Sequence, residues 1–173
     1  MKNPIIILGS SRSFGETRKV IEEIIGKIQT PVIDLKELNI SPYDYEHHNS
    51  NDDYIPLMEK VIEHDLLVLA TPIYWYSMSA VMKIFIDRLS DLLDIRKDIG
   101  YKLREKKLFV IASYGGSYTK CFEDTFEQIC NYMGMKYEGC SFVSSRNNLE
   151  LNKENKSQII KARNVMFSPE STF

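Results

Sequence analysis

Residues 5–17 read Ile-Ile-Ile-Leu-Gly-Ser-Ser-Arg-Ser-Phe-Gly-Glu-Thr. The run from Pro4 to Leu8 is typical of a buried strand. After the loop, apolar residues recur at the spacing of one face of an amphipathic helix, at Val20, Ile21, Ile24, Ile25 and Ile28. A strand, a small-residue loop and a helix in this order predict a phosphate site, because loop N–H groups and the positive end of the helix dipole converge on one anion.

The loop itself is rich in hydrogen-bond donors. It contains several hydroxyl side chains, and Arg12 is its only fully charged donor. A phosphate monoester carries nearly two negative charges and needs several charge-assisted hydrogen bonds, each worth roughly 1.5 to 3 kcal/mol. Taken alone, the loop fits a simple strand-to-helix turn equally well, with Ser13 or Thr17 as the helix cap.

Length and composition limit the function classes. A chain of 173 residues with 43% apolar content is the size of one domain, residues 1–173, able to bury roughly 70% of its unfolded surface. Lys and Arg number 22 against 24 Asp and Glu, so neither nucleic acid nor an anionic membrane is indicated as a partner. The first apolar run is too short for a signal peptide or a membrane span, which predicts a cytoplasmic protein. The three cysteines lack C-x-x-C spacing, so we expect no metal site.

Apolar strand candidates alternate with helical patterns along the whole chain. The strands are predicted at Pro4–Leu8, Pro31–Leu35, Leu66–Thr71, Lys107–Ser113 and Lys136–Val143. Strands that are apolar on both faces indicate a parallel sheet covered by helices on both sides, so the fold class is α/β with a doubly wound, five-stranded sheet. Ligands of such sheets bind beyond the carboxyl ends of the strands. Two polar segments, Lys36–Asp53 and Asp94–Lys106, are predicted to be surface excursions.

Two more loops follow predicted strands at this edge. The first, Thr71 to Ser79, contains the consecutive aromatics Tyr74, Trp75 and Tyr76, which suit a flat conjugated ligand because ring stacking adds about 0.5 to 1.5 kcal/mol per pair. Ser77 or Ser79 is expected to cap the next helix. The second runs from Ser113 to Tyr118, where paired glycines permit positive φ and close approach of a ring system.

Plainer interpretations exist for several of these residues. The three aromatics could be a surface for a partner subunit, because interfaces are enriched in aromatic side chains. Asp87 and Arg88 are predicted to form a local ion pair with no catalytic role, and His47 and His48 are predicted to be solvated.

A phosphate cradle, an aromatic loop and a glycine loop at one sheet edge describe a ligand with a phosphate tail and a planar head, such as FMN. Gly-Ser-Ser-Arg-x-x-Gly-x-Thr at 9–17, Pro-Ile-Tyr-Trp-Tyr-Ser-Met-Ser-x-x-Met-Lys-x-Phe-Ile-Asp-Arg at 72–88 and Tyr-Gly-Gly at 114–116 resemble the motifs of the NAD(P)H-dependent FMN reductase and quinone reductase group of flavodoxin-like proteins. The resemblance covers Met1 to about Val143. It implies a flavodoxin-like sheet with strand order 2-1-3-4-5.

The resemblance also implies a set of FMN contacts. The phosphate would be held by Ser10, Arg12, Ser13, Gly15 and Thr17; the ribityl chain and isoalloxazine would lie along Pro72, Ile73, Tyr74, Trp75, Tyr76 and Ser77; and the pyrimidine side would meet Ser113, Tyr114, Gly115 and Gly116. The chain departs from the family pattern at Glu16, where many relatives have Asn. Unless its carboxylate points to solvent or caps a helix N–H, Glu16 should weaken FMN binding.

The resemblance implies an oxidoreductase that takes hydride from NAD(P)H through FMN and reduces a quinone, azo, nitro or flavin acceptor. Because the cofactor performs the bond-making, no side chain is assigned as a catalytic acid or base. Relatives of this kind imply a homodimer or homotetramer. Two alternatives stay open: a flavodoxin-type electron carrier without nicotinamide chemistry, although a net charge of −2 offers little of the acidic docking face that such carriers use, and an inactive binding module.

Overall fold

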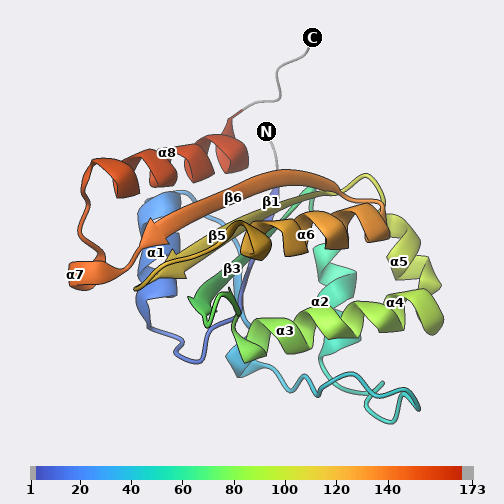
Figure 1. The fold of residues 1–173 in the computed structure, drawn as a ribbon. Helices are drawn as coiled ribbons and strands as arrows, with labels where there is room; N and C mark the ends of the chain where they lie inside the picture. Colours follow the sequence, from blue (N-terminus) through green and yellow to red (C-terminus); the bar gives the residue numbers. More distant parts are fainter. Residues whose placement is uncertain (1–2, 169–173) are drawn as a thin grey trace.

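The computed structural model describes residues 3–168, so the outermost residues of the predicted domain 1–173 lie outside the described part of the chain (Figure 1). Its elements are β1 (Pro4–Leu8), α1 (Glu16–Ile25), β2 (Val32–Asp34), η1 (Leu35–Glu37), α2 (Tyr54–Val61), β3 (Leu66–Tyr74), β4 (Ser77–Met78), α3 (Ala80–Asp87), η2 (Arg88–Ser90), α4 (Asp91–Asp94), α5 (Lys97–Leu103), β5 (Lys107–Tyr114), α6 (Lys120–Met133), β6 (Lys136–Ser144), α7 (Arg146–Leu149) and α8 (Lys153–Phe167). All five predicted strands are present, and β3 extends three residues beyond its predicted end at Thr71.

The sheet has the order β2-β1-β3-β5-β6, with parallel pairing between all of these neighbours. This is the predicted 2-1-3-4-5 order of a doubly wound sheet, and it is confirmed. The winding direction reverses between β1 and β3, which places the loops that follow these two strands beside each other. The short β4 pairs with the end of β3 in an antiparallel hairpin.

Helices cover the sheet on two sides (Figure 1). Along β1, Ile6 and Leu8 face a core that includes apolar residues of α1 and α8, whereas Ile5 and Ile7 face a larger core with α2, α3, α5 and α6. All four of these β1 side chains are fully buried. The alternation explains why the strand reads as a continuous apolar run. None of the helices described between residues 3 and 168 combines the length and apolar character required to cross a bilayer.

Three details of the predicted elements are wrong. The loop Thr71–Ser79 is a hairpin whose turn is only Trp75-Tyr76. The segment Asp94–Lys106 contains helix α5, because Gly100, read as a loop signal, permits packing on α4: a Cβ there would lie 2.3 Å from the Leu92 carbonyl oxygen. Ile28 lies outside α1, since Gly26 ends that helix with φ of +56°.

The polar segment Lys36–Asp53 is held by a buried cation. Arg88 is fully buried, and its guanidinium pairs with Asp52 and with Asp91, the latter at 2.6 Å. It also donates to the Ser41 carbonyl at 3.0 Å. The predicted ion pair between Asp87 and Arg88 is therefore wrong, because spacing along a helix does not reveal partners on another segment.

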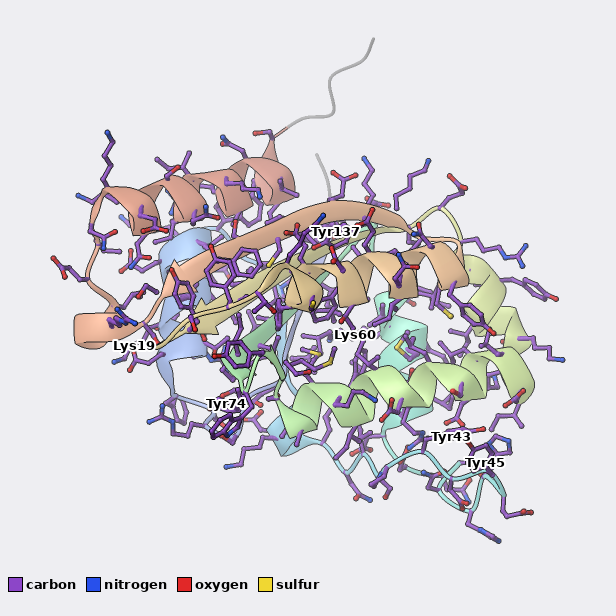
Figure 2. The ribbon with its side chains drawn as sticks, viewed as in Figure 1. Lys19, Tyr43, Tyr45, Lys60, Tyr74 and Tyr137 are labelled. Carbon is purple, nitrogen blue, oxygen red and sulfur yellow. The ribbon has the colours of Figure 1, made fainter. Side chains whose placement is uncertain are left out.

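Other charged residues near this segment also find partners. Asp87 pairs instead with Lys83 on its own helix. His47 is not simply solvated, since its Nδ1 lies 3.2 Å from Asp91 Oδ1, whereas His48, with an 80% exposed side chain, pairs with Asp44. The segment is thus fastened beneath α3 and α4, and Tyr43 and Tyr45 on it lie far from Tyr74 in Figure 2.

Candidate functional site

Three loops meet at the carboxyl edge of the sheet, and each is tied to another by hydrogen bonds. The loop after β1 contacts the β5 end through Thr17 Oγ1 and Ser113 Oγ, 2.8 Å apart. Ser79 Oγ, at the start of α3, donates to the Gly9 carbonyl at 2.6 Å. Ser11 Oγ and the Tyr74 hydroxyl are 3.5 Å apart, at the outer limit for a hydrogen bond. Residues distant in sequence therefore form one continuous surface.

The loop after β1 presents unpaired backbone donors. The N–H groups of Ser11, Ser13, Phe14, Glu16 and Thr17 have no hydrogen-bond partner within residues 3–168. Gly15 is the N-cap of α1 and no side chain caps this helix, so the alternative role of Ser13 or Thr17 as a cap is wrong. A run of free N–H groups at the start of a ten-residue helix can bind an anion.

Charge near these amides comes from two side chains. Arg12 is exposed, and its side chain folds beside Gly15, where an added Cβ would lie 3.1 Å from Arg12 Cβ. Glu16 places Oε1 3.0 Å from Lys19 Nζ, so its charge is paired within α1, and its Oε2 is buried with no hydrogen-bond partner in the described residues. Glu16 therefore neither caps a helix N–H nor leaves its charge unpaired beside the free amides.

The predicted hydroxyl ligands are mostly used within the protein. Ser10, Thr17 and Ser113 are only 2–3% exposed. Ser10 Oγ accepts from the Arg12 N–H at 3.3 Å, and Thr17 and Ser113 bind each other. In this structure their role is to join the loops. The groups available to a ligand are therefore the backbone amides, Arg12 and the half-buried Ser13, whose hydroxyl has no hydrogen-bond partner among the described residues.

The aromatic turn between β3 and β4 is the most exposed part of the site. Trp75 is 95% exposed, and Tyr74 and Tyr76 are about half exposed. Both turn residues have positive φ, 50° for Trp75 and 65° for Tyr76, in a region that bulky side chains rarely occupy. Of the two predicted caps, Ser79 is correct, since its Oγ accepts from the Met82 N–H at 3.1 Å, whereas Ser77 belongs to β4.

A hollow of about 550 Å³ lies between this turn and the glycine loop, lined by Ile73, Tyr74, Trp75, Tyr76, Gly116 and Ser117. Pro72 is buried within β3 behind it, and Tyr114 packs edge-on against Tyr118. Burial, reinforced by Glu154 and Tyr118, raises the pKa of the Tyr114 hydroxyl, which therefore stays protonated at neutral pH. The hollow is open and largely walled by aromatic side chains, as a planar ring requires.

The glycine loop differs from its prediction. Neither Gly115 nor Gly116 has positive φ, so that reason for glycine is wrong. An added Cβ at Gly116 would meet nothing within 4 Å. The remaining reason for glycine there is that a ligand can approach the backbone closely. The loop is held by Arg146, which donates to the carbonyls of Gly115 and Gly116 and which no motif in the sequence marked.

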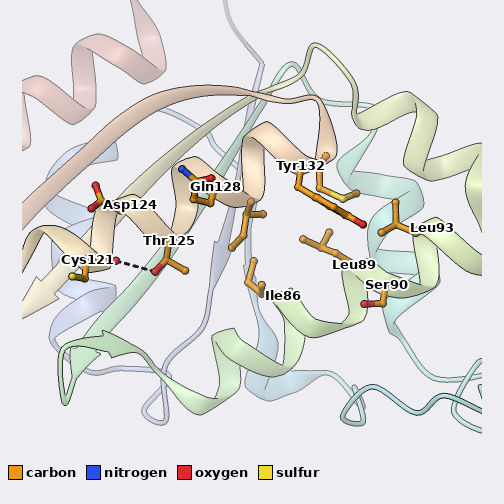
Figure 3. Close-up of a pocket in the computed structure, with 11 residues that line it drawn as sticks. Ile86, Leu89, Ser90, Leu93, Cys121, Asp124, Thr125, Gln128 and Tyr132 are labelled. Carbon is orange, nitrogen blue, oxygen red and sulfur yellow. Dashed lines mark hydrogen bonds between the residues drawn. The ribbon is translucent and has the colours of Figure 1, made fainter.

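A second hollow, of about 610 Å³, lies between α6 and the helical segment from α3 to α4 (Figure 3). Its walls are mainly apolar and include Ile86, Leu89, Leu93, Ile129 and Met133. It contains none of the predicted FMN contacts, so the candidate site for a phosphorylated planar ligand is the edge where the three loops meet.

These features define a class: doubly wound α/β proteins with a loop of unpaired amides after the first strand and an open aromatic hollow at the same carboxyl edge of the sheet. The family model described as NADPH-dependent FMN reductase matches residues 3–148. The chain belongs to that family of NAD(P)H-dependent, FMN-containing oxidoreductases.

One relative agrees with this assignment, and two solved structures share the fold. YwqN of Bacillus subtilis, named as a candidate NAD(P)H-dependent FMN-containing oxidoreductase, is 34% identical over 146 residues, which cover 78% of this chain and 80% of YwqN. A structure described as an NADPH-quinone reductase from P. pentosaceus superposes with a TM-score of 0.71 at 16% identity, covering 98% of this chain and 100% of that one. Megasphaera elsdenii flavodoxin shares the fold, with a TM-score of 0.56, 16% identity and coverage of 92% and 98%.

Proposed function

We propose that this protein binds FMN across the three loops and uses it to reduce a small acceptor of the quinone, azo, nitro or flavin type with electrons from NAD(P)H. The observation that carries the proposal is that the five free amides within residues 11–17 lie beside the aromatic hollow, through the contacts of Thr17 with Ser113 and of Ser11 with Tyr74. An anion site and a ring site are thereby joined on one surface.

Each loop would do a different part of the binding. The amides of Ser11, Ser13, Phe14, Glu16 and Thr17, together with Arg12, would hold the phosphate, in keeping with the known preference of helix N-termini for anions. The turn at Trp75-Tyr76 would cover one part of the ring and Gly116 would border another, since both line the hollow. The ion pair with Lys19 reduces the repulsion that Glu16 would exert on the phosphate.

Bound there, FMN would supply the chemistry, accepting hydride from NAD(P)H and delivering electrons to the acceptor. The protein would anchor the cofactor and leave one side of the hollow open for the nicotinamide and the acceptor in turn. Positioning is sufficient for this role, and we assign no side chain as a general acid or base.

The test uses purified protein reconstituted with FMN. We expect flavin absorption that co-elutes with the protein, and rapid anaerobic bleaching on addition of NADPH or NADH. A protein that takes up no FMN would overturn the proposal. A protein that binds FMN tightly but is bleached only slowly by either nucleotide would indicate an electron carrier instead.

We further propose that the active form is a homodimer or homotetramer. The support is the exposed aromatic turn, because Trp75 at 95% exposure is unusual for a chain that functions alone. A second copy near the turn would also narrow the hollow and add contacts to the acceptor.

A further inference from the structure

Arg146 lies just after β6 and reaches back to the glycine loop after β5. Its Nε donates to the Gly115 carbonyl at 2.7 Å and its second guanidinium nitrogen donates to the Gly116 carbonyl at 3.0 Å. The backbone is tied at the same place, because the Ser145 N–H donates to the Tyr114 carbonyl at 2.8 Å. One planar cation therefore holds two consecutive carbonyl groups.

Two other contacts hold the ends of the loop, namely the Ser145 N–H on the Tyr114 carbonyl and the ring of Tyr118 stacked on Phe142 with centroids 4.0 Å apart, and Arg146 holds the two glycines between them. Glycine has more backbone freedom than any other residue, and neither Gly115 nor Gly116 has a conformation that only glycine can adopt. Side-chain crowding does not restrict Gly116 either, since an added Cβ would meet nothing within 4 Å. The orientation of these peptide groups therefore depends on Arg146.

The orientation of the carbonyls decides the orientation of the amides. In a trans peptide the C=O and the following N–H point in opposite directions, so the N–H groups of Gly116 and Ser117 point away from the guanidinium. Both residues line the hollow beside the aromatic turn, and neither N–H has a hydrogen-bond partner in the described part of the chain. They are free donors on a loop whose geometry is held from behind.

We propose that Arg146 is a positioning residue for the ring of the bound flavin: it holds the Gly116 and Ser117 N–H groups for the acceptor atoms at the ring edge, and its positive charge favours the ring when it is electron-rich. This inference rests on the proposed function. Arg146 contributes in two separable ways, through the two-pronged hydrogen bonding that lysine cannot reproduce and through a charge that lysine retains.

The chain provides a matched control. Arg163 on α8 makes the same kind of contact far from the hollow, with Nε donating to the Ile24 carbonyl at 2.9 Å and a second nitrogen to the Glu23 carbonyl at 2.7 Å. Arg163→Gln removes an equivalent pair of hydrogen bonds and an equal charge. It therefore separates a specific effect on the loop from a general loss of stability.

The first measurement is NMR relaxation of the backbone N–H groups in the FMN-free protein, which reports their motion on the picosecond-to-nanosecond timescale. We expect Arg146→Gln to lower the order parameters of Gly116 and Ser117, Arg146→Lys to do so partly, and Arg163→Gln to leave them unchanged. Equal order parameters in Arg146→Gln and wild type would overturn the positioning role without any reference to FMN.

The second measurement is FMN affinity and midpoint potential. We expect Arg146→Gln to raise the Kd for FMN roughly tenfold, as expected for a site that loses its preorganisation, and to lower the midpoint potential. Arg146→Lys should keep most of the potential but not the affinity, and Arg163→Gln should match wild type. If wild type binds FMN and Arg146→Gln leaves both values unchanged, the inference is wrong while the proposed function stands. If wild type binds no FMN, the proposed function fails and this inference fails with it.

Discussion

Arg12 is the residue whose removal separates phosphate binding from ring binding. It is the only positively charged residue between Gly9 and Thr17, and it lies beside Gly15 at the free amides. A charge-assisted hydrogen bond to phosphate is worth about 1.5 to 3 kcal/mol, so Arg12→Ala should raise the Kd for FMN by about 10- to 100-fold.

Riboflavin lacks the phosphate and provides the control for this prediction. Titration followed by flavin fluorescence should give the same riboflavin affinity for Arg12→Ala and wild type. The exposed residue Lys60, on α2, provides a matched variant, since Lys60→Ala should leave both affinities unchanged. Equal FMN affinity in Arg12→Ala and wild type would remove Arg12 from the site.

Asp52 governs how the stability of the fold responds to acid. Burial alone would raise the pKa of this carboxyl, but hydrogen bonds from Arg88 and from the N–H groups of Ser41 and Tyr54 outweigh it and lower the pKa below the ordinary value of 3.8. The unfolded chain therefore binds the proton more readily than the native state does. The contribution of Asp52 to stability is full above pH 3.8 and is lost as the pH falls through the lowered native pKa.

Urea unfolding at a series of pH values tests this prediction. Asp52→Asn removes one of the carboxylates that pair with the buried Arg88, so it should lower the free energy of unfolding by about 3 to 5 kcal/mol at pH 7. Between neutral and acidic pH, the variant should then lose less stability than wild type does. Asp98→Asn removes an exposed carboxylate that pairs with Arg96 and should have little effect. An Asp52→Asn variant as stable as wild type at pH 7 would contradict the role assigned to the cluster.

At the scale of elements, the β3–β4 hairpin carries strain where a planar ligand would bind. Two-residue hairpin turns with positive φ usually contain Asn-Gly, whereas this chain has Trp75-Tyr76. Strained positions cost about 1 to 3 kcal/mol each. The double variant Trp75→Asn with Tyr76→Gly relieves both positions and should therefore raise the free energy of unfolding by about 2 kcal/mol or more, while it weakens FMN binding.

Glu105 provides a control, because it is a strained position outside the candidate site. It also has positive φ, at 65°, but lies between α5 and β5, away from the aromatic turn. Glu105→Gly should leave FMN affinity unchanged. A turn variant that binds FMN as tightly as wild type would show that the aromatic side chains do not contact the ring.

Sequence patterns predicted the elements that follow from local apolar periodicity. Ile5 to Leu8 forms a strand buried on both faces because its side chains alternate between two cores, and Ser79 caps α3 as its position predicts. Gly100 misled the prediction, because the reason for glycine there is the contact with Leu92, which only the packed structure reveals.

The candidate site was predictable to a similar extent. The loops that meet at the carboxyl edge follow from the parallel strand order, which fixes where each strand ends. The internal partners Thr17 and Ser113 and the contact of Arg146 with the glycine loop depend on the distance between segments far apart in sequence. The spacing of residues along the chain does not predict such contacts.

At the scale of the whole molecule, we expect residues 1–173 to unfold as one domain in a single cooperative transition and to associate into a homodimer or homotetramer. Light scattering should then give a multiple of the 20.1 kDa chain mass. Trp75→Ser should weaken association if the aromatic turn is the contact. Association that survives Trp75→Ser but is lost in Tyr132→Glu would place the contact at the apolar hollow of Figure 3 instead. A purely monomeric mass would contradict the assembly.

The proposed function requires that three loops from one edge of the sheet bind one FMN molecule together. The most direct measurement is a crystal structure of the protein grown or soaked with FMN. We expect the phosphate at the free N–H groups within residues 11–17, near Arg12, and the ring in the hollow between Trp75-Tyr76 and Gly116. Density for FMN in another hollow, or a phosphate site closed by the Glu16 carboxylate, would contradict it.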